Sequence, residues 1–254
     1  MNSGERQLAI TDAVRRDGKV QVTGLAALLG CSEMTVRRDL EALEAAKVLR
    51  RVHGGAVRMF LGAEETPFDL RVGQRASAKK AVADAAAELL TDGETLILDG
   101  GTTALEIARR IRNRRLTVMP LSLRPLPELL DREQIRVLLP GGEVRPGEHT
   151  FLGDMAEASF DQLHFDTCLL SSCGIDVKEG VTDTLLSEVA VKRAAARAAQ
   201  RIVLAVDSAK LGKVAFGRIC AATDVDIVVT DAAATEQALA ELRAASIDVH
   251  VAGG

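Results

Sequence analysis

The sequence has no tryptophan, no tyrosine and only six phenylalanines among its 254 residues. Its interior must therefore be aliphatic, and single-stranded nucleic acids, which stack their bases on aromatic rings, would find few platforms. No apolar run approaches the roughly 20 residues of a membrane-spanning helix. The Met1 end lacks the apolar stretch of a signal peptide. These absences predict a cytoplasmic protein without a membrane partner.

Cysteine is also scarce. The four cysteines are Cys31, Cys168, Cys173 and Cys220. None forms a Cys-x-x-Cys pair, so reduced, mostly buried thiols are expected rather than disulfides or zinc ligands. The sequence therefore predicts neither a metal site nor a cofactor.

Charge is distributed unevenly along the chain. Residues 1–60 hold ten Lys and Arg against seven Asp and Glu, a balance of +3. The remaining residues hold 22 against 29, a balance of −7, which gives the net charge of −4. A basic head on an acidic body is typical of a DNA reader joined to a domain with a different partner.

A helix-turn-helix is predicted near the start of the chain. Val36, Leu40 and Leu43 recur at i, i+4 and i+7, which places one apolar stripe on a helix. A second helical segment over 23–29 precedes it, and Gly30-Cys31 reads as the tight turn between them. A basic second helix after such a turn fits the major groove of double-stranded DNA.

The outward face of this second helix can read bases, and the hairpin that follows can grip phosphates as a wing. Ser32 can also cap the helix through a backbone N–H of its first turn. An ordinary surface hairpin with solvated charges is the alternative. The candidate DNA-binding residues are Ser32, Thr35, Arg37, Arg38, Arg50, Arg51, His53 and Arg58.

The segment 20–57 also resembles the N-terminal module of the DeoR family of bacterial transcriptional regulators. The resemblance rests on Thr-Val-Arg-Arg-Asp-Leu at 35–40 and Arg-Val-His-Gly-Gly-Ala at 51–56. It implies a winged helix-turn-helix that binds operator DNA, and it continues through nearly all of the chain.

From residue 77 onward, apolar strands alternate with helical segments. Strands are predicted at 95–99, 116–121, 135–139, 167–171, 202–206, 227–230 and 249–251. The alternation predicts an α/β fold with a mostly parallel sheet covered by helices on both faces. The predicted organisation is a DNA-binding domain over 1–58, a linker over 59–76 and an effector-sensing domain over 77–254.

The best candidate for a ligand site is the turn Asp99-Gly100-Gly101-Thr102-Thr103, between a predicted strand and a helix. Its glycines let the backbone present N–H groups and its threonines add hydroxyls at a helix N-terminus, which suits a phosphate or carboxylate. A strand-to-helix turn without a ligand is the alternative. The spacing matches neither a dinucleotide fingerprint nor a Walker loop.

A second turn, Asp207-Ser208-Ala209-Lys210, follows another predicted strand. If the strands are parallel, both turns lie on one edge of the sheet, where Lys210 would supply a full positive charge. A solvated loop lysine is the commoner case. Gly174 could let the chain pass close to a ligand, whereas Glu188 and Lys192 are expected to form a structural i,i+4 pair.

These pieces resemble the DeoR sensor domain, which is similar in fold to ribose-5-phosphate isomerase. The resemblance implies that the Gly-Thr-Thr turn and Lys210 hold the phosphate of a sugar-phosphate effector. The sequence departs from the family in two places. Gly100 stands where family members commonly have a serine, and the segment 119–122 stands where they commonly have a Thr-Asn pair. The candidate effector-binding residues are Asp99, Gly100, Gly101, Thr102, Thr103, Gly174, Asp207 and Lys210.

The function predicted is a DNA-binding repressor of carbohydrate-metabolism genes, controlled by a phosphorylated sugar. A homo-oligomer, dimer or tetramer, is expected because one small head buries too little surface to be selective. The alternative is a sugar-phosphate isomerase with a DNA-binding head, in which Asp99, Glu188, Asp207 and Lys210 could shuttle protons. No carboxylate spacing requires that chemistry, so no catalytic residue is assigned. A third possibility is an architectural DNA-binding protein without a ligand.

Overall fold

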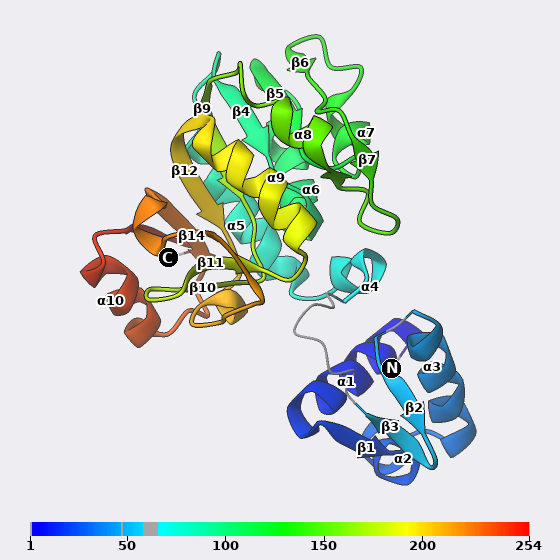
Figure 1. Ribbon diagram of the computed structural model, residues 1–254. Coiled ribbons are helices and arrows are strands. Elements are labelled where there is room, and N and C mark those ends of the chain that lie inside the picture. The colour runs from blue at the N-terminus through cyan, green and yellow to red at the C-terminus, as the bar shows by residue number, and fades with distance from the viewer. Residues whose placement is uncertain (1, 47, 58–65, 254) are drawn as a thin grey trace. The chain divides into compact units, whose positions relative to one another are not determined.

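The computed structural model describes residues 2–46, 48–57 and 66–253. The chain divides into two compact units, Met1–Arg71 and Val72–Gly254 (Figure 1). The predicted linker over 59–76 contains a short helix, α4 (Phe68–Val72). Residues 59–65 of that linker, like Arg58, lie outside the described residues.

The first unit combines helices with a three-stranded antiparallel sheet in the order β1-β3-β2. Its elements are α1 (Ser3–Asp17), β1 (Lys19–Gln21), α2 (Val22–Leu29), α3 (Glu33–Ala45), β2 (Arg50–Val52) and β3 (Gly55–Val57).

Local sequence sets the boundaries of the two central helices. Gly30 ends α2 in the left-handed conformation with φ 61°, which glycine adopts without strain. Ser32 caps α3 by accepting a hydrogen bond from the Thr35 N–H at 3.2 Å, as predicted. The stripe of Val36, Leu40 and Leu43 is buried, at most 1% exposed. The predicted helix-turn-helix and its wing are therefore confirmed.

The second unit is a helix-covered α/β fold. In chain order its elements are α5 (Ala76–Glu88), β4 (Thr95–Leu98), α6 (Gly101–Ile111), β5 (Leu116–Pro120), α7 (Leu126–Leu129), β6 (Ile135–Val137), β7 (Glu143–Val144), β8 (Phe151–Leu152), α8 (Asp154–Ala158), β9 (Phe165–Leu170), β10 (Gly174–Asp176), β11 (Gly180–Asp183), α9 (Leu186–Arg197), β12 (Ala199–Ala205), β13 (Gly217–Cys220), β14 (Ile227–Asp231), α10 (Glu236–Ala244) and β15 (Asp248–Ala252), with short 3-10 turns at η1 (Ser208–Lys210) and η2 (Ala222–Asp224).

Seven of these strands form one sheet in the order β15-β14-β12-β9-β4-β5-β6, and every pair in it is parallel. They correspond to the seven predicted strands, so the predicted parallel sheet is confirmed. Because β4, β9 and β12 are parallel neighbours, the two candidate turns do lie at one edge of the sheet. The strand order reverses between β4 and β9, and open parallel sheets bind ligands beyond the carboxyl ends of strands at such a point.

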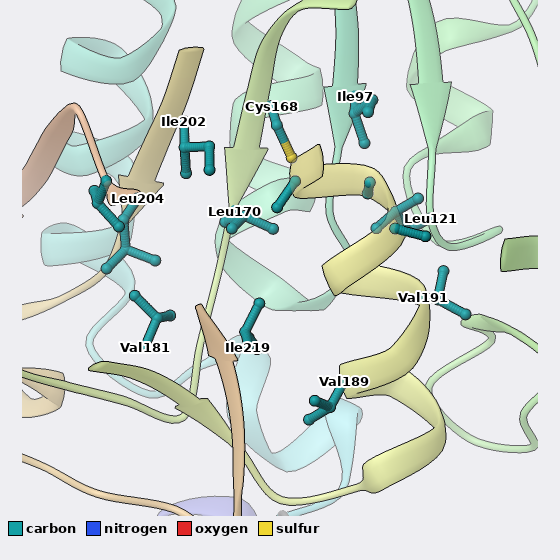
Figure 2. Packing of buried hydrophobic residues seen from close by; sticks show 14 of the residues in the cluster. Ile97, Leu121, Cys168, Leu170, Val181, Val189, Val191, Ile202, Leu204 and Ile219 are labelled. Carbon is teal, nitrogen blue, oxygen red and sulfur yellow. The ribbon is translucent and has the colours of Figure 1, made fainter. Parts of the chain in front are cut away.

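Apolar side chains alternate between the two faces of the sheet. Leu96 and Leu98 of β4 pack with α5 and α6, whereas Ile97 between them packs on the opposite face with α8 and α9. Figure 2 shows the α9 face, where Val189 of the helix lies beside Ile219 of β13. Each fully buried side chain of this kind contributes about 1.5–3 kcal/mol. This packing holds α9 against β9 and β12 of the large sheet.

Two antiparallel pieces were not predicted. The small sheet β10-β11-β13 and the hairpin β7–β8 consist of strands of two to four residues, too short to show an alternating pattern. The small sheet closes over the α9 face through Ile175, Val181 and Ile219, all at most 4% exposed.

None of the four cysteines forms a disulfide. Cys168 is buried, which raises its pKa well above the ordinary value, and burial raises the pKa of Cys220 to about 11. The other three cysteines are half-buried, so the prediction of mostly buried thiols is correct only for Cys168. Within the described ranges, no helix is long and apolar enough to cross a bilayer. No group of three or more His, Cys, Asp or Glu residues in these ranges could hold a metal ion.

Candidate DNA interface and effector site

The outward face of α3 presents two arginines in different states. Arg37 forms an exposed ion pair with Glu33, one turn earlier, at 3.1 Å. Such a pair contributes only about 0.3–0.5 kcal/mol, so DNA can take Arg37 from it. Arg38 is exposed, and its guanidinium has no hydrogen-bond or ion-pair partner in the described part of the chain. Arg38 is therefore the freer of the two to reach a base edge.

The next residue, Asp39, points inward and joins α3 to α1. Its carboxylate accepts hydrogen bonds from Arg6 Nε at 2.7 Å and from the Ser3 hydroxyl at 3.3 Å, and it is only 3% exposed. In the Arg-Arg-Asp run of α3, the two arginines thus point outward and Asp39 points inward. The sequence pattern alone did not reveal that division.

The wing is pinned to α3 by one of its own arginines. Arg51 Nη1 donates to Glu41 at 3.0 Å, and the backbone N–H of Arg51 donates to Glu44 at 2.8 Å. Arg51, a predicted phosphate contact, therefore has partners within the head. Arg50 is exposed without a partner among the described residues, and His53 is exposed at the hairpin tip.

Gly55 is the position of the wing that only glycine can occupy. A Cβ there would lie 2.0 Å from the carbonyl oxygen of Val20 on β1, the strand that pairs with β3. In the Gly-Gly pair of the sequence motif, packing thus requires Gly55, whereas Gly54 has open space around it and is favoured by its φ of 77°. The predicted contact Arg58 lies outside the described residues.

In the sensor unit, Asp99 ties β4 to β9 where the strand order reverses. Its Oδ1 accepts from the Gly100 N–H at 2.7 Å, and its Oδ2 accepts from the Ser171 N–H at 2.8 Å and hydroxyl at 2.9 Å. The carboxylate is 1% exposed. Asp99 therefore shapes the candidate turn and holds it against β9.

The turn delivers the chain directly into α6. Gly101 has φ 86°, which favours glycine, and the helix begins there without a side-chain cap. Uncapped N–H groups at the start of an eleven-residue helix carry the positive end of its dipole. Thr102 and Thr103 add hydroxyls to this first turn and are 7% and 8% exposed. This local geometry suits an anion.

Behind the turn, α9 supplies a buried lysine shared by two carboxylates. Lys192 Nζ lies 2.9 Å from Asp99 Oδ2 and 2.7 Å from Asp183 Oδ2. Burial raises the pKa of Asp99, and the charge of Lys192 offsets this only in part. Burial alone would raise the pKa of Asp183, but the charge and hydrogen bond of Lys192 lower it on balance. Burial opposes the charge on Lys192, yet Asp183 and Asp99 raise its pKa well above the ordinary value.

The predicted i,i+4 pair between Glu188 and Lys192 is wrong. Glu188 Oε1 accepts instead from Arg145 Nη1 at 2.8 Å and from the Thr150 hydroxyl at 2.5 Å. Both partners belong to the β7–β8 hairpin region, which the sequence pattern did not detect. Glu188 thus pairs with residues distant in the sequence and not with Lys192, one turn along the same helix.

The second candidate turn lies two strands from β4, about 10 Å away by the usual strand spacing. The Asp207 carboxylate caps η1 through the Ala209 N–H at 3.0 Å and accepts from Arg75 Nη1 at 3.4 Å. Lys210 is half-exposed, and its ammonium makes no hydrogen bond or ion pair within the described ranges. Lys210 is thus the residue of this turn whose charge remains available to a ligand.

Gly174 permits a close approach, but to the chain itself. A Cβ at this position would lie 2.2 Å from the carbonyl oxygen of Lys213. Gly100 is also tightly packed, since a Cβ there would lie 2.9 Å from Thr150 Cγ2 and 3.4 Å from Ser122 Cβ. The segment over 119–122 and the β7–β8 hairpin therefore border the candidate turn.

Comparisons with known proteins agree with this division of the chain. Residues 6–59 match the DeoR-like helix-turn-helix domain, and residues 74–232 match the DeoR C terminal sensor domain. The chain is 32% identical to the HTH-type transcriptional regulator GolR of Listeria innocua, covering 98% of each protein. It is 32% identical to a putative aga operon transcriptional repressor of Escherichia coli O157:H7, covering 99% of this chain and 94% of that protein. A lactose phosphotransferase system repressor of Streptococcus mutans is 32% identical, with 91% and 93% covered.

Among solved structures, ribose 5-phosphate isomerase A from Methanocaldococcus jannaschii aligns with a TM-score of 0.41 and 17% identity. The alignment covers 54% of this chain and 55% of the isomerase.

Proposed function

Because this chain belongs to the DeoR family of transcriptional regulators, we propose that it represses carbohydrate-metabolism genes under the control of a phosphorylated sugar. The sugar binds the sensor unit and changes the affinity of the head for operator DNA. Two relatives reported above are named as a putative aga operon transcriptional repressor and as a lactose phosphotransferase system repressor, which supports the carbohydrate role.

The chain is a regulator and not an enzyme. The relatives reported above are named transcriptional regulators or repressors, and this chain matches them over nearly their whole length. Of the four groups that could shuttle protons, Asp99 and Asp207 are committed to shaping turns, and Glu188 is held by Arg145 and Thr150, which leaves Lys210 without a carboxylate that could act with it. The isomerase alternative is thereby dropped.

One observation carries the phosphate assignment. The uncapped first turn of α6 stands where the strand order reverses, and Lys210 carries an uncommitted charge at the same sheet edge. Backbone N–H groups at a helix start and a nearby lysine are the usual ligands of a phosphate monoester. In this proposal Gly101, Thr102 and Thr103 bind the phosphate, and the ammonium of Lys210 neutralises part of its negative charge.

At the head, Thr35, Arg37 and Arg38 contact base edges, while Arg50 and His53 contact phosphates. The proposal retains domains over 1–58 and 77–254 with a linker between them. It also places the regulator in the cytoplasm as a dimer or tetramer, because two heads on repeated half-sites bind far more selectively than one.

Thermal melting of the full chain against sugar phosphates tests the effector proposal. At a hundred times its dissociation constant, a ligand that binds only the folded sensor unit stabilises it by about 2.7 kcal/mol, a rise of roughly 5–10 °C. We expect that rise with one phosphorylated sugar, its absence with the unphosphorylated parent, and its loss in Lys210→Ala. Because the chain has no Trp or Tyr, circular dichroism or calorimetry is the suitable readout. A panel without any shift would contradict the sensor assignment.

A further inference from the structure

A second recognition element lies directly beside the proposed phosphate turn. Glu188, in the first turn of α9, is 5% exposed and pairs with Arg145, which follows β7 and is 24% exposed at its side chain. The Thr150 hydroxyl donates to the same carboxylate oxygen, Oε1, at 2.5 Å. This trio plays no part in the phosphate assignment above.

Thr150 connects the trio to the turn. Its Cγ2 lies 2.9 Å from the point where a Cβ on Gly100 would stand, while its hydroxyl bonds to Glu188. One turn further along α9, Lys192 bonds to Asp99 at the base of the same turn. The helix thus presents a carboxylate beside the candidate phosphate site and a lysine beneath it.

Stability is a weak explanation of this pair, in which Glu188 is buried and Arg145 is half-buried. Removing two charges from water costs several kcal/mol per ion, and apolar residues of similar volume commonly stabilise a fold as well or better. The second oxygen of Glu188, Oε2, has no hydrogen-bond partner in the described part of the chain. The hydroxyl of Ser172, just beyond the end of β9, is also buried and without a partner among the described residues. Acceptor and donor capacity is therefore unused near the site.

The chemistry of the pair matches a sugar hydroxyl. A carboxylate accepts hydrogen bonds from hydroxyl groups, and an adjacent guanidinium donates to their oxygens, so together they fit neighbouring hydroxyls of a polyol. We infer that Glu188 and Arg145 read the hydroxyl groups of the effector and set its specificity, while the α6 turn holds its phosphate. This inference rests on the proposed function, since it assigns the sugar-facing side of the same site.

The test compares two kinds of ligand that share a phosphate. Dissociation constants are measured by calorimetric titration of the full chain with ethyl phosphate, which has no sugar hydroxyl, and with ribose 5-phosphate, fructose 6-phosphate and glucose 6-phosphate. In the wild type we expect at least one sugar phosphate to bind more tightly than ethyl phosphate. Glu188→Gln should weaken that sugar phosphate by about 10- to 100-fold, the usual value of hydrogen bonds to a charged group. Ethyl phosphate should change by less than about twofold, because Glu188 does not contact the phosphate.

A matched control is Glu128→Gln on α7. Glu128 also pairs with arginines, Arg109 at 3.2 Å and Arg112 at 4.0 Å, but it lies away from the turn. This variant should bind both kinds of ligand as the wild type does. If Glu188→Gln does not fold, Arg145→Lys serves instead: it keeps the charge but loses the planar fork, and should weaken the sugar phosphate alone.

The outcomes separate this inference from the proposed function on which it rests. A wild type that binds no phosphate monoester contradicts the proposed function itself and this inference with it. A wild type that binds ethyl phosphate as tightly as every sugar phosphate overturns hydroxyl recognition but leaves the phosphate site standing. Hydroxyl recognition is likewise overturned if Glu188→Gln or Arg145→Lys weakens both kinds of ligand equally, or neither.

Discussion

Replacing Lys192 with methionine is expected to lower the free energy of unfolding by about 3–5 kcal/mol, the usual cost of removing one partner from a buried ion pair. Lys192 lies between Asp99 and Asp183, which are 1% and 3% exposed. Methionine fills a similar volume, so the loss reports the two uncompensated carboxylates and not a cavity. Urea unfolding of the full chain, followed by circular dichroism, measures it.

Lys210→Met is the matched control for this prediction. The same substitution at a half-exposed lysine without a partner in the described ranges should change stability by less than about 0.5 kcal/mol. Equal losses for the two variants would contradict a buried, charge-compensating role for Lys192.

The deficit of Lys192→Met should shrink as the pH falls. Burial already raises the pKa of Asp99 in the wild type, and without Lys192 only the hydrogen bonds with Cys173 and the Thr184 N–H oppose the same effect on the pKa of Asp183. A carboxyl whose pKa is raised by folding contributes most below its unfolded value and loses that contribution as the pH rises through its folded value. The variant should therefore be closest to the wild type at or below about pH 4, which is roughly the pKa of an aspartate in the unfolded chain, and furthest from it at neutral pH.

Replacing Arg38 with alanine is expected to weaken operator binding by about 1–3 kcal/mol, roughly 5- to 150-fold, with a smaller loss on bulk DNA. Arg38 is exposed on α3 and has no competing partner among the described residues, whereas Arg37 must first leave Glu33. Fluorescence anisotropy with an operator selected from random duplexes, at fixed salt, gives both affinities.

Arg50→Ala is the comparison variant in the wing. A phosphate contact carries no sequence information, so this change should weaken operator and bulk DNA alike and reduce the salt slope by about one. If Arg38→Ala also weakened both DNAs equally, Arg38 would be only a phosphate contact.

The helix-turn-helix and the parallel sheet of this protein could be predicted because short patterns in the sequence determine them. The stripe of Val36, Leu40 and Leu43 and the Ser32 cap act within a few residues of one another. Each apolar strand of the parallel sheet is likewise marked by a run of a few consecutive residues. Turn chemistry likewise predicted that Asp99 and Lys210 would stand at one edge of the sheet, since parallel strands end together.

The side-chain partners were not predictable in the same way. Lys192 had an eligible local partner in Glu188, but it bonds to Asp99, far away in the sequence. Arg145 comes from a hairpin whose strands are too short to leave a pattern. Such contacts depend on how α9 packs across the sheet, which no spacing within the sequence encodes.

The most direct test of effector control is the affinity of the full chain for its operator, with and without the sugar phosphate that raises its melting temperature. Fluorescence anisotropy at fixed salt should show a change of about 5- to 150-fold at saturating sugar phosphate, the usual range of coupling between two sites. Lys210→Ala should bind the operator as the wild type does and show no such change. An operator affinity unaltered by every sugar phosphate, or a Lys210→Ala variant that responds like the wild type, would contradict effector control through this site.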